Sequence, residues 1–433
     1  TLSCQPERKV SLLFAGADEA NVNGNITLNI TNGHFGKVFG GNNLGGAVKG
    51  KITVNVEETG CQPIKIDELY LGGNEAAYEP TISGEETAEN HAHTNVIIDG
   101  CDLTSIKQVY GGGNAASTPA TLVTINGAFE IDEVFGGGNG SDKIKRQSGT
   151  DVSWLTNPGA NVGFHAYDAD SEAFDTPEER LVKQYGFGKA QVNIGGGTIH
   201  SVFGGSNSKG NVREVAVATL DDLSDCDFIV GEAYGGGKEA EMDGRAELNL
   251  GCIPKGGKVG AVYGGAKMTN VNNDVVLNIT NGTFDAVYGG NNMSGEIRGT
   301  ITVNVEEKGC TPIIIGKLFG GGNQAPYSVE QIPEAKRETD ETKATYYKNY
   351  PQVNVISATR IGQVFGGGDN AAVTGNPHVK IDMVKGKVNN VEQNLGTICQ
   401  VFGGGNNAGV TGSTYVDIVK GQITKEVKTA ATV

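Results

Sequence analysis

The chain has few of the features that define membrane, nucleic-acid-binding and fibrous proteins. No run of apolar residues approaches the ~18 residues that a membrane-spanning helix requires. Lysine and arginine total 34 against 50 aspartates and glutamates, so the net charge is −16. This charge disfavours nucleic acid or an anionic membrane as a partner, because both bind basic surfaces. Proline is scarce, at 12 residues, and no Gly-X-Y period occurs, which excludes collagen.

Glycine is abundant instead, at 67 of 433 residues, and many glycines belong to a repeated segment. An aliphatic residue, an aromatic residue and glycine recur in twelve copies, two of them degenerate. The shortest interval between successive aromatic residues is 25 residues, and it occurs three times. The aromatic positions are Phe14, Phe39, Tyr70, Tyr110, Phe135, Phe203, Tyr234, Tyr263, Tyr288, Phe319, Phe365 and Phe402.

Each repeat contains short segments in which apolar and polar residues alternate, as in 26–30 and 301–305. This alternation indicates strands with one buried face, and no helical period accompanies it. Three short strands in each repeat predict an all-β fold, a parallel β-solenoid of about twelve coils with loop insertions and one short helix. Since crossovers between parallel strands are overwhelmingly right-handed, we expect right-handed coiling.

Coils stacked ~4.8 Å apart place equivalent residues in columns. The aromatic residues are expected to form an inward stack of rings that includes Phe39, Tyr110, Phe135, Phe203, Phe319 and Phe402. The intervening glycines are expected to supply the left-handed backbone of a sharp corner. Four positions after the ring, eight copies have an asparagine that is expected to bond to the coils above and below. These are Asn43, Asn74, Asn114, Asn139, Asn207, Asn292, Asn323 and Asn406.

A second, longer repeat relates the two ends of the chain. Residues 26–78 align without a gap with residues 275–327, at an offset of 249. This indicates a duplicated block of coils with two extra coils between the copies. We interpret the whole chain, 1–433, as one solenoid. Its parts are a first block (1–139), an insertion (140–190), two middle coils (191–258) and a second block that duplicates the first (259–433).

The motif V-[F/Y]-G-G-G-N, as in 109–114 and 401–406, makes the chain resemble the right-handed parallel β-helix superfamily. Within that superfamily, its repeat style is similar to that of glycine-rich, adhesin-like surface proteins of gut bacteria. The resemblance covers nearly the whole chain except the insertions. It implies an extracellular or cell-surface location and a binding role, for which we expect a glycan or glycoprotein ligand.

The longest insertion, 140–190, contains the richest set of candidate ligand-binding side chains. Exposed aromatic rings can stack on sugars or anchor a protein partner. Alternatively, these rings pack a helix onto the coils. A capping box at 176–179 predicts such a helix, ending at Gly186. The candidates are Trp154, Phe164, His165 and Tyr167.

Smaller insertions occupy matching places in the two blocks, at 75–93 and 324–352, so we expect both to project from the same edge. The first contains His91 and His93, whose spacing suits either a metal site or a solvated loop. The second adds three candidate ligand-binding residues, Tyr346, Tyr347 and Tyr350.

Two acidic clusters are candidates for calcium, because carboxylates at alternate positions are typical of calcium loops. The alternative is an acidic loop exposed to solvent, and the first cluster lacks the glycine of an EF-hand loop. The first cluster comprises Asp168, Asp170, Glu172 and Asp175, and the second Asp221, Asp222, Asp225 and Asp227. No other cofactor is expected.

Seven cysteines allow at most three disulfides. Cys61 and Cys101 are predicted to lie in one column of adjacent coils, where the ~4.8 Å spacing permits a bond. Cys226 and Cys252 form a second neighbouring pair. The alternative is that the cysteines are ordinary buried core residues. The chain begins at Thr1 without an apolar leader and ends at Val433 without a cap, so we expect a mature form or part of a longer chain.

Three classes of function remain open. Polysaccharide lyases and hydrolases need a base or paired carboxylates, and the β-helix enzymes that this fold resembles contain Gly-His-Gly and Arg-Ile-Lys segments. Here the first segment is absent, and the nearest match to the second is the sequence at 360–362. We therefore predict a non-enzymatic, adhesin-like scaffold, with a polysaccharide-active enzyme and a structural stalk as alternatives. The enzyme alternative predicts acidic side chains and a base converging on the outer face of stacked strands.

Overall fold

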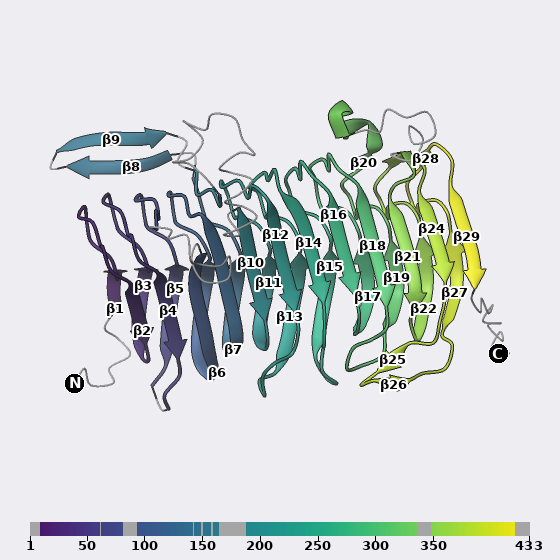
Figure 1. Ribbon diagram of the computed structural model, residues 1–433, viewed down its shortest axis with the longest axis horizontal. Coiled ribbons are helices and arrows are strands. Elements are labelled where there is room, and N and C mark those ends of the chain that lie inside the picture. The colour runs from purple at the N-terminus through teal and green to yellow at the C-terminus, as the bar shows by residue number, and fades with distance from the viewer. Residues whose placement is uncertain are drawn as a thin grey trace, which may run out of the picture.

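The computed structural model describes residues 9–60, 62–80, 93–141, 143–148, 150–156, 159–163, 188–336 and 348–420. These residues form coils that stack along one axis from the N-terminal to the C-terminal end (Figure 1). The main sheet has 22 strands and curls nearly closed around that axis. All of its strand pairings are parallel, which confirms the predicted all-β, solenoid-like architecture.

Each coil contributes one strand to each of two faces, so a strand pairs with the second strand after it along the chain. Two long strands, β6 (His93–Tyr110) and β7 (Ala120–Phe135), run through both faces. The other strands of the first face are β2 (Ile26–Ile30), β4 (Ile52–Glu57), β10 (Lys189–Ile194), β12 (Val215–Leu220), β14 (Arg245–Leu250), β16 (Val275–Ile279), β18 (Ile301–Glu306), β21 (Gln352–Ser357), β24 (His378–Asp382) and β29 (Tyr415–Lys420).

The second face ends each of its strands with an aromatic residue. Besides β6 and β7 it contains β1 (Lys9–Phe14), β3 (Gly33–Phe39), β5 (Ile64–Tyr70), β11 (Gly197–Phe203), β13 (Phe228–Tyr234), β15 (Lys258–Tyr263), β17 (Thr283–Tyr288), β19 (Ile314–Phe319), β22 (Arg360–Phe365) and β27 (Thr397–Phe402).

The third side of the coil has less strand structure than the full third strand that we predicted. It consists of isolated bridges, such as Val162 to Val212, and of three two-residue strands. These are β20 (Tyr327–Ser328), β23 (Val373–Thr374) and β28 (Val410–Thr411). A coil therefore has two full strands and one short connecting side.

Alternation along the first-face strands builds the aliphatic core. In β4, Ile52, Val54 and Val56 are buried, whereas Thr53 and Asn55 lie on the outer side. The register places each inward residue on its equivalent in the next coil, for example Val54 on Val96. Branched aliphatic side chains fill such a column well because each one repeats the shape of its neighbour.

The aromatic residues form one continuous stack, with ring centroids 4.6–5.1 Å apart and ring planes within 11° of one another. The rings are buried, but they form a cluster of their own that is separate from the aliphatic core. The cause is alternation: Leu69 points into the core, so Tyr70 points to the opposite side of the strand. Stacked neighbours keep most of the rings buried. Phe402, the last ring in the stack, is 40% exposed.

The asparagines after the rings form a ladder of side-chain hydrogen bonds. Asn74 Nδ2 donates to Asn43 Oδ1 at 2.9 Å, and the same bond recurs through Asn114, Asn139 and Asn207 at 2.8–3.0 Å. In the second block Asn323 donates to Asn292 at 2.9 Å, and Asn406 donates to Asp369 at 2.7 Å. The predicted bonds between coils are confirmed. Three of these amides also donate to buried tyrosine hydroxyls, those of Tyr70, Tyr110 and Tyr234.

Close approach, and not a left-handed backbone, requires glycine at the corner after each ring. A Cβ on Gly41 would lie 2.7 Å from the backbone nitrogen of Gly73 in the next coil, and one on Gly290 would lie 2.8 Å from that of Gly322. None of the glycines directly after a ring has a positive φ. The expectation of left-handed corners is therefore wrong here. Left-handed glycines occur at other turns, such as Gly46 and Gly295.

Two disulfides join coils that are not adjacent: Cys101 to Cys226, and Cys252 to Cys310. The predicted pairs Cys61–Cys101 and Cys226–Cys252 are therefore wrong. The alternative of unpaired core cysteines is also wrong for the four cysteines that form these two bonds. The coils in between have tight corners; a Cβ on Gly127 would collide with the Cys226 sulfur. Each disulfide links the middle coils to one of the two blocks.

The remaining elements lie outside the main sheet. An antiparallel hairpin, β8 (Lys143–Ser148) and β9 (Asp151–Thr156), and two 3-10 turns, η1 (Val329–Gln331) and η2 (Glu334–Lys336), occupy one edge of the coils (Figure 1). A smaller hairpin, β25 (Lys387–Val388) and β26 (Val391–Glu392), lies on the opposite edge. The predicted helix at 176–186 lies outside the described residues. In the described part of the chain, no helix is long and apolar enough to cross a membrane.

Candidate functional site

The β8–β9 hairpin presents an exposed tryptophan beyond the edge of the coils (Figure 1). Its strands pair in full register, with Lys145 opposite Trp154. Trp154 is 57% exposed, and Val152, two residues earlier on the same face of β9, is 48% exposed. A large aromatic side chain that is left in solvent on a projecting hairpin is available to a ligand.

The structure divides the insertion 140–190 in two. Residues 159–163 return to the coil, where Ala160 and Val162 are fully buried and Val162 bridges to Thr118 and Val212. The hairpin is therefore separated from the rest of the insertion by a segment of the coil. The candidates Phe164, His165, Tyr167, Asp168, Asp170, Glu172 and Asp175 lie outside the described residues.

The candidates of the second insertion divide in the same way. Tyr346 and Tyr347 lie outside the described residues, as do His91 and the side chain of His93. Tyr350 is only 8% exposed and belongs to the aliphatic core, next to the coil formed by β21. Its ring is not available to a ligand, so the prediction of Tyr350 as a ligand-binding residue is wrong.

The acidic loop at 221–227 is used in turns between coils. Asp221 Oδ1 accepts the backbone N–H of Cys252 at 2.6 Å, and burial raises the pKa of Asp222 above its ordinary value. Asp225 and Asp227 are exposed. Among the described residues, these four carboxylates do not assemble a set of three ligand atoms for a metal. The loop is therefore a structural corner in which Asp221 satisfies the backbone of the next coil.

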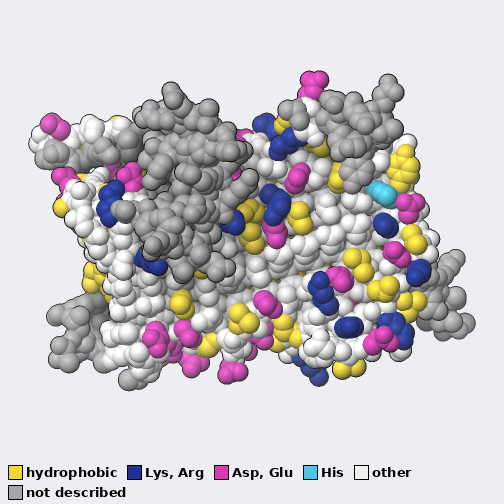
Figure 2. All heavy atoms as spheres, in the orientation of Figure 1, with side chains coloured by type: hydrophobic (Ala, Val, Ile, Leu, Met, Phe, Trp, Pro, Cys, Tyr) yellow, Lys and Arg dark blue, Asp and Glu magenta, His cyan; other side chains and the backbone are white. Residues whose placement is uncertain are grey.

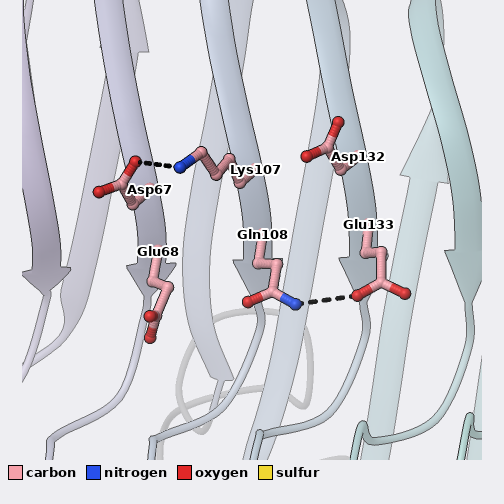
Figure 3. A pocket seen from close by; sticks show the side chains of 6 residues that line it. All are labelled: Asp67, Glu68, Lys107, Gln108, Asp132 and Glu133. Carbon is pink, nitrogen blue, oxygen red and sulfur yellow. Dashed lines mark hydrogen bonds and ion pairs between the residues drawn. The ribbon is translucent and has the colours of Figure 1, made fainter.

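A shallow polar groove of about 490 Å³ opens on the outer side of the second face, across β5, β6 and β7. We call it the outer groove; its lining residues are Asp67, Glu68, Lys107, Gln108, Asp132 and Glu133. They come from the two consecutive outward positions that precede the last core residue of each strand (Figure 3). Three adjacent strands thus present two polar side chains each.

Most carboxylates of the outer groove are paired with cations or amides. Lys107 Nζ lies 2.9 Å from Asp67 Oδ1, and Lys9 also pairs with Asp67. These two lysines hold the pKa of Asp67 below its ordinary value. Glu68 pairs with Lys37 at 2.7 Å, while Glu133 pairs with Lys238 at 2.6 Å and accepts a 2.9 Å hydrogen bond from Gln108. The groove is a network of charges that links neighbouring coils.

Charges of both signs are distributed over the described surface. Figure 2 shows acidic and basic side chains interspersed on the visible face, with no large basic area. Lys238 and Lys267, which replace asparagine in the ladder, extend this pattern by bonding to Glu133 and to Glu232.

Sequence reasoning did not find the outer groove. Asp67, Lys107 and Asp132 all stand three residues before a ring, so aligning the repeats on the rings would have placed them in one column. The next coil continues that column with His200. Acidic groups and a histidine thus converge on the outer face of stacked strands.

Comparison of the chain with protein families, with curated proteins and with solved structures gave no match.

Proposed function

We propose that this chain is an extracellular or cell-surface scaffold that binds a glycan or glycoprotein through the β8–β9 hairpin. The observation that carries the proposal is the exposed pair Trp154 and Val152 on a hairpin outside the sheet. Burying a tryptophan against a ligand provides a large contact area at low cost in side-chain entropy. The two strands of the hairpin are held by backbone pairing, which leaves the exposed side chains of Val152 and Trp154 free to contact a partner.

Three further features support this proposal. The stacked rings and the asparagine ladder make a long, regular support for projecting segments. The two disulfides suit an oxidising compartment, such as the space outside a cell. The repeat style resembles that of adhesin-like surface proteins of gut bacteria, which agrees with a binding role.

The test is a glycan and mucin array probed with the purified chain, with and without calcium. Trp154→Ala should abolish or strongly reduce binding. Phe129→Ala is the matched control, because Phe129 is 55% exposed but lies on β7 in the coil. Loss of binding with Phe129→Ala and not with Trp154→Ala would move the ligand from the hairpin to the coil surface. A chain that binds nothing on the array would support the stalk alternative.

A second variant tests whether the hairpin is a separate module. Replacing residues 144–155 with Gly-Gly keeps the pair Lys143 and Thr156 and closes it with a two-residue turn. We expect unchanged coil folding by circular dichroism and loss of array binding. Unfolding of the coils would contradict the modular interpretation. The cut avoids Val162, whose burial in the coil means that deleting all of 141–189 would damage the core.

A second candidate function, a polysaccharide-active enzyme, is favoured by one observation: carboxylates and His200 meet on the outer face. General acid catalysis needs a carboxyl group with a raised pKa, whereas the pKa of Asp67 is lowered by its lysine partners. Product analysis of any polysaccharide bound on the array separates the two functions. Cleavage products that disappear with Asp132→Asn would favour the enzyme.

A further inference from the structure

A histidine and two carboxylates form a compact cluster on the outer surface of β7 and β11. Glu130 and Asp132 are two residues apart on the outer side of β7, and His200 lies beside Asp132 on the neighbouring strand. One ligand atom from each residue lies within 4.8 Å of the other two. All three side chains are about half exposed, so a solvated ion can reach them.

We propose that Glu130, Asp132 and His200 bind a divalent transition-metal ion such as Zn²⁺. An imidazole nitrogen with two carboxylate oxygens is a ligand set that zinc accepts, and three protein ligands leave a position for water or an outside ligand. Calcium is less suited to this set, since it takes six to eight oxygen ligands. The site is distinct from the hairpin, so metal binding does not depend on the proposed glycan-binding function.

Each carboxylate already lies at a metal-ligand spacing from one nitrogen of the His200 ring. Ligand atoms 2.0–2.2 Å from a tetrahedral zinc ion are separated from one another by about 3.3–3.6 Å. His200 Nε2 lies 3.3 Å from Glu130 Oε1, and His200 Nδ1 lies 3.4 Å from Asp132 Oδ1. To bind one ion, the His200 ring or one carboxylate must turn so that all three ligand atoms, which lie within 4.8 Å of one another, face the same point. The side chains are about half exposed and have room to do so. Both carboxylates come from one strand, so the backbone fixes their spacing.

The fold itself does not require these side chains. At the column position of Asp132 and His200, other coils have glycine, as at Gly231 and Gly260. In the coil of β27, the residues that correspond to Glu130 and Asp132 are Thr397 and Cys399. Removing one ligand should therefore change metal affinity without unfolding the coils.

The experiment titrates the full chain with ZnSO₄ by isothermal titration calorimetry. His200→Ala should remove one equivalent of bound zinc or weaken that site at least about tenfold, since even outer-shell changes at metal sites cost ~10–100-fold in affinity. Asp132→Asn, a conservative change, should weaken the same equivalent. Visible absorption of bound Co²⁺ should report the same loss.

Two controls make the result specific. Asp285→Asn removes a carboxylate from the same column in another coil, where its column neighbours are Gly260 and Gly316, and it should leave zinc binding unchanged. His378→Ala removes the histidine that pairs with Asp417 at 2.7 Å and should also leave zinc binding unchanged. In the described part of the chain, His378 belongs to no group of three possible metal ligands. Equal zinc binding by the wild type and His200→Ala would overturn the proposal and leave an ion pair in its place. A loss in the controls as large as that in His200→Ala would overturn it as well.

Discussion

In the first block, the column three residues before the rings contains Asp67, Lys107 and Asp132, whereas the second block has Gly316, Gly362 and Cys399 there. The buried side of the same coils differs much less. The hydroxyl of Tyr78 donates to the carbonyl of Gly50 at 3.0 Å. At the offset of 249 residues, Tyr327 donates to Gly299 at 2.9 Å.

Two carboxylates at equivalent positions, Glu58 and Glu307, repeat this agreement between the blocks. Glu307, which is 2% exposed, accepts the backbone N–H groups of Ile313 and Thr359 at 2.7 and 2.8 Å. Its counterpart Glu58 likewise accepts a backbone N–H from the next coil, that of Leu103, at 2.9 Å. Positions that satisfy the backbone of the next coil are thus shared by the blocks, while the outer column differs. The comparison separates residues that support the coil from residues that are available for a ligand.

The largest expected loss of stability comes from core substitutions, which test whether the two blocks have equivalent cores. Ile64 and Ile313 correspond in the alignment, and both are fully buried. Ile64→Ala and Ile313→Ala should each lower the free energy of unfolding by ~2–5 kcal/mol, because each leaves a cavity in a packed column. Chemical denaturation followed by circular dichroism measures both. Effects that differ several-fold between the two variants would show that the blocks are not equivalent scaffolds.

An intermediate effect is expected where the outer columns differ. A Cβ on Gly316 would lie 2.5 Å from the carbonyl oxygen of Asp285 in the preceding coil. Gly316→Ala should therefore cost ~1–3 kcal/mol, as overpacking does. Asp67→Ala, at the equivalent place, already has room for a Cβ and should cost less in the same denaturation assay. Wild-type stability for Gly316→Ala would mean that the glycine is not needed for close approach of the coils.

The smallest effect concerns the ion pairs of the outer groove. The pKa of folded Asp67 is below its value of ~3.9 in an unfolded chain, so its charge stabilises the fold above about pH 4. That contribution is lost as the pH falls through the folded pKa. Asp67→Asn should cost less than about 1 kcal/mol at pH 7, because the pairs are partly exposed.

The difference between wild type and Asp67→Asn should shrink in 1 M salt and vanish at low pH. Urea unfolding at pH 7 and at pH 2 measures it. A difference that persists unchanged at pH 2 would contradict an electrostatic origin. Asp285→Asn supplies the comparison from the second block, where its column neighbours are glycines.

The cysteines show where reasoning from the sequence fails. Their offsets from the rings suggested bonds between adjacent coils, but Cys101 bonds to Cys226 over the corner at Gly127. Whether two cysteines meet at a corner depends on the direction in which each chain segment runs there, and the segments differ in length. The number of residues between a cysteine and the ring of its coil carries no information about that direction. The insertion 140–190 shows a similar failure. Residues 159–163 return to the core, but they are too short a segment to be recognised from the pattern of apolar residues.

The sequence by itself determined the solenoid, the ring column and the asparagine ladder. These features join like residues in successive coils, so the repeat period records them directly. The tertiary structure alone decided which face buries the rings, which cysteines pair, and that Glu130, Asp132 and His200 meet. These contacts join unlike residues separated by loops of variable length, and only the register of the folded strands brings them together.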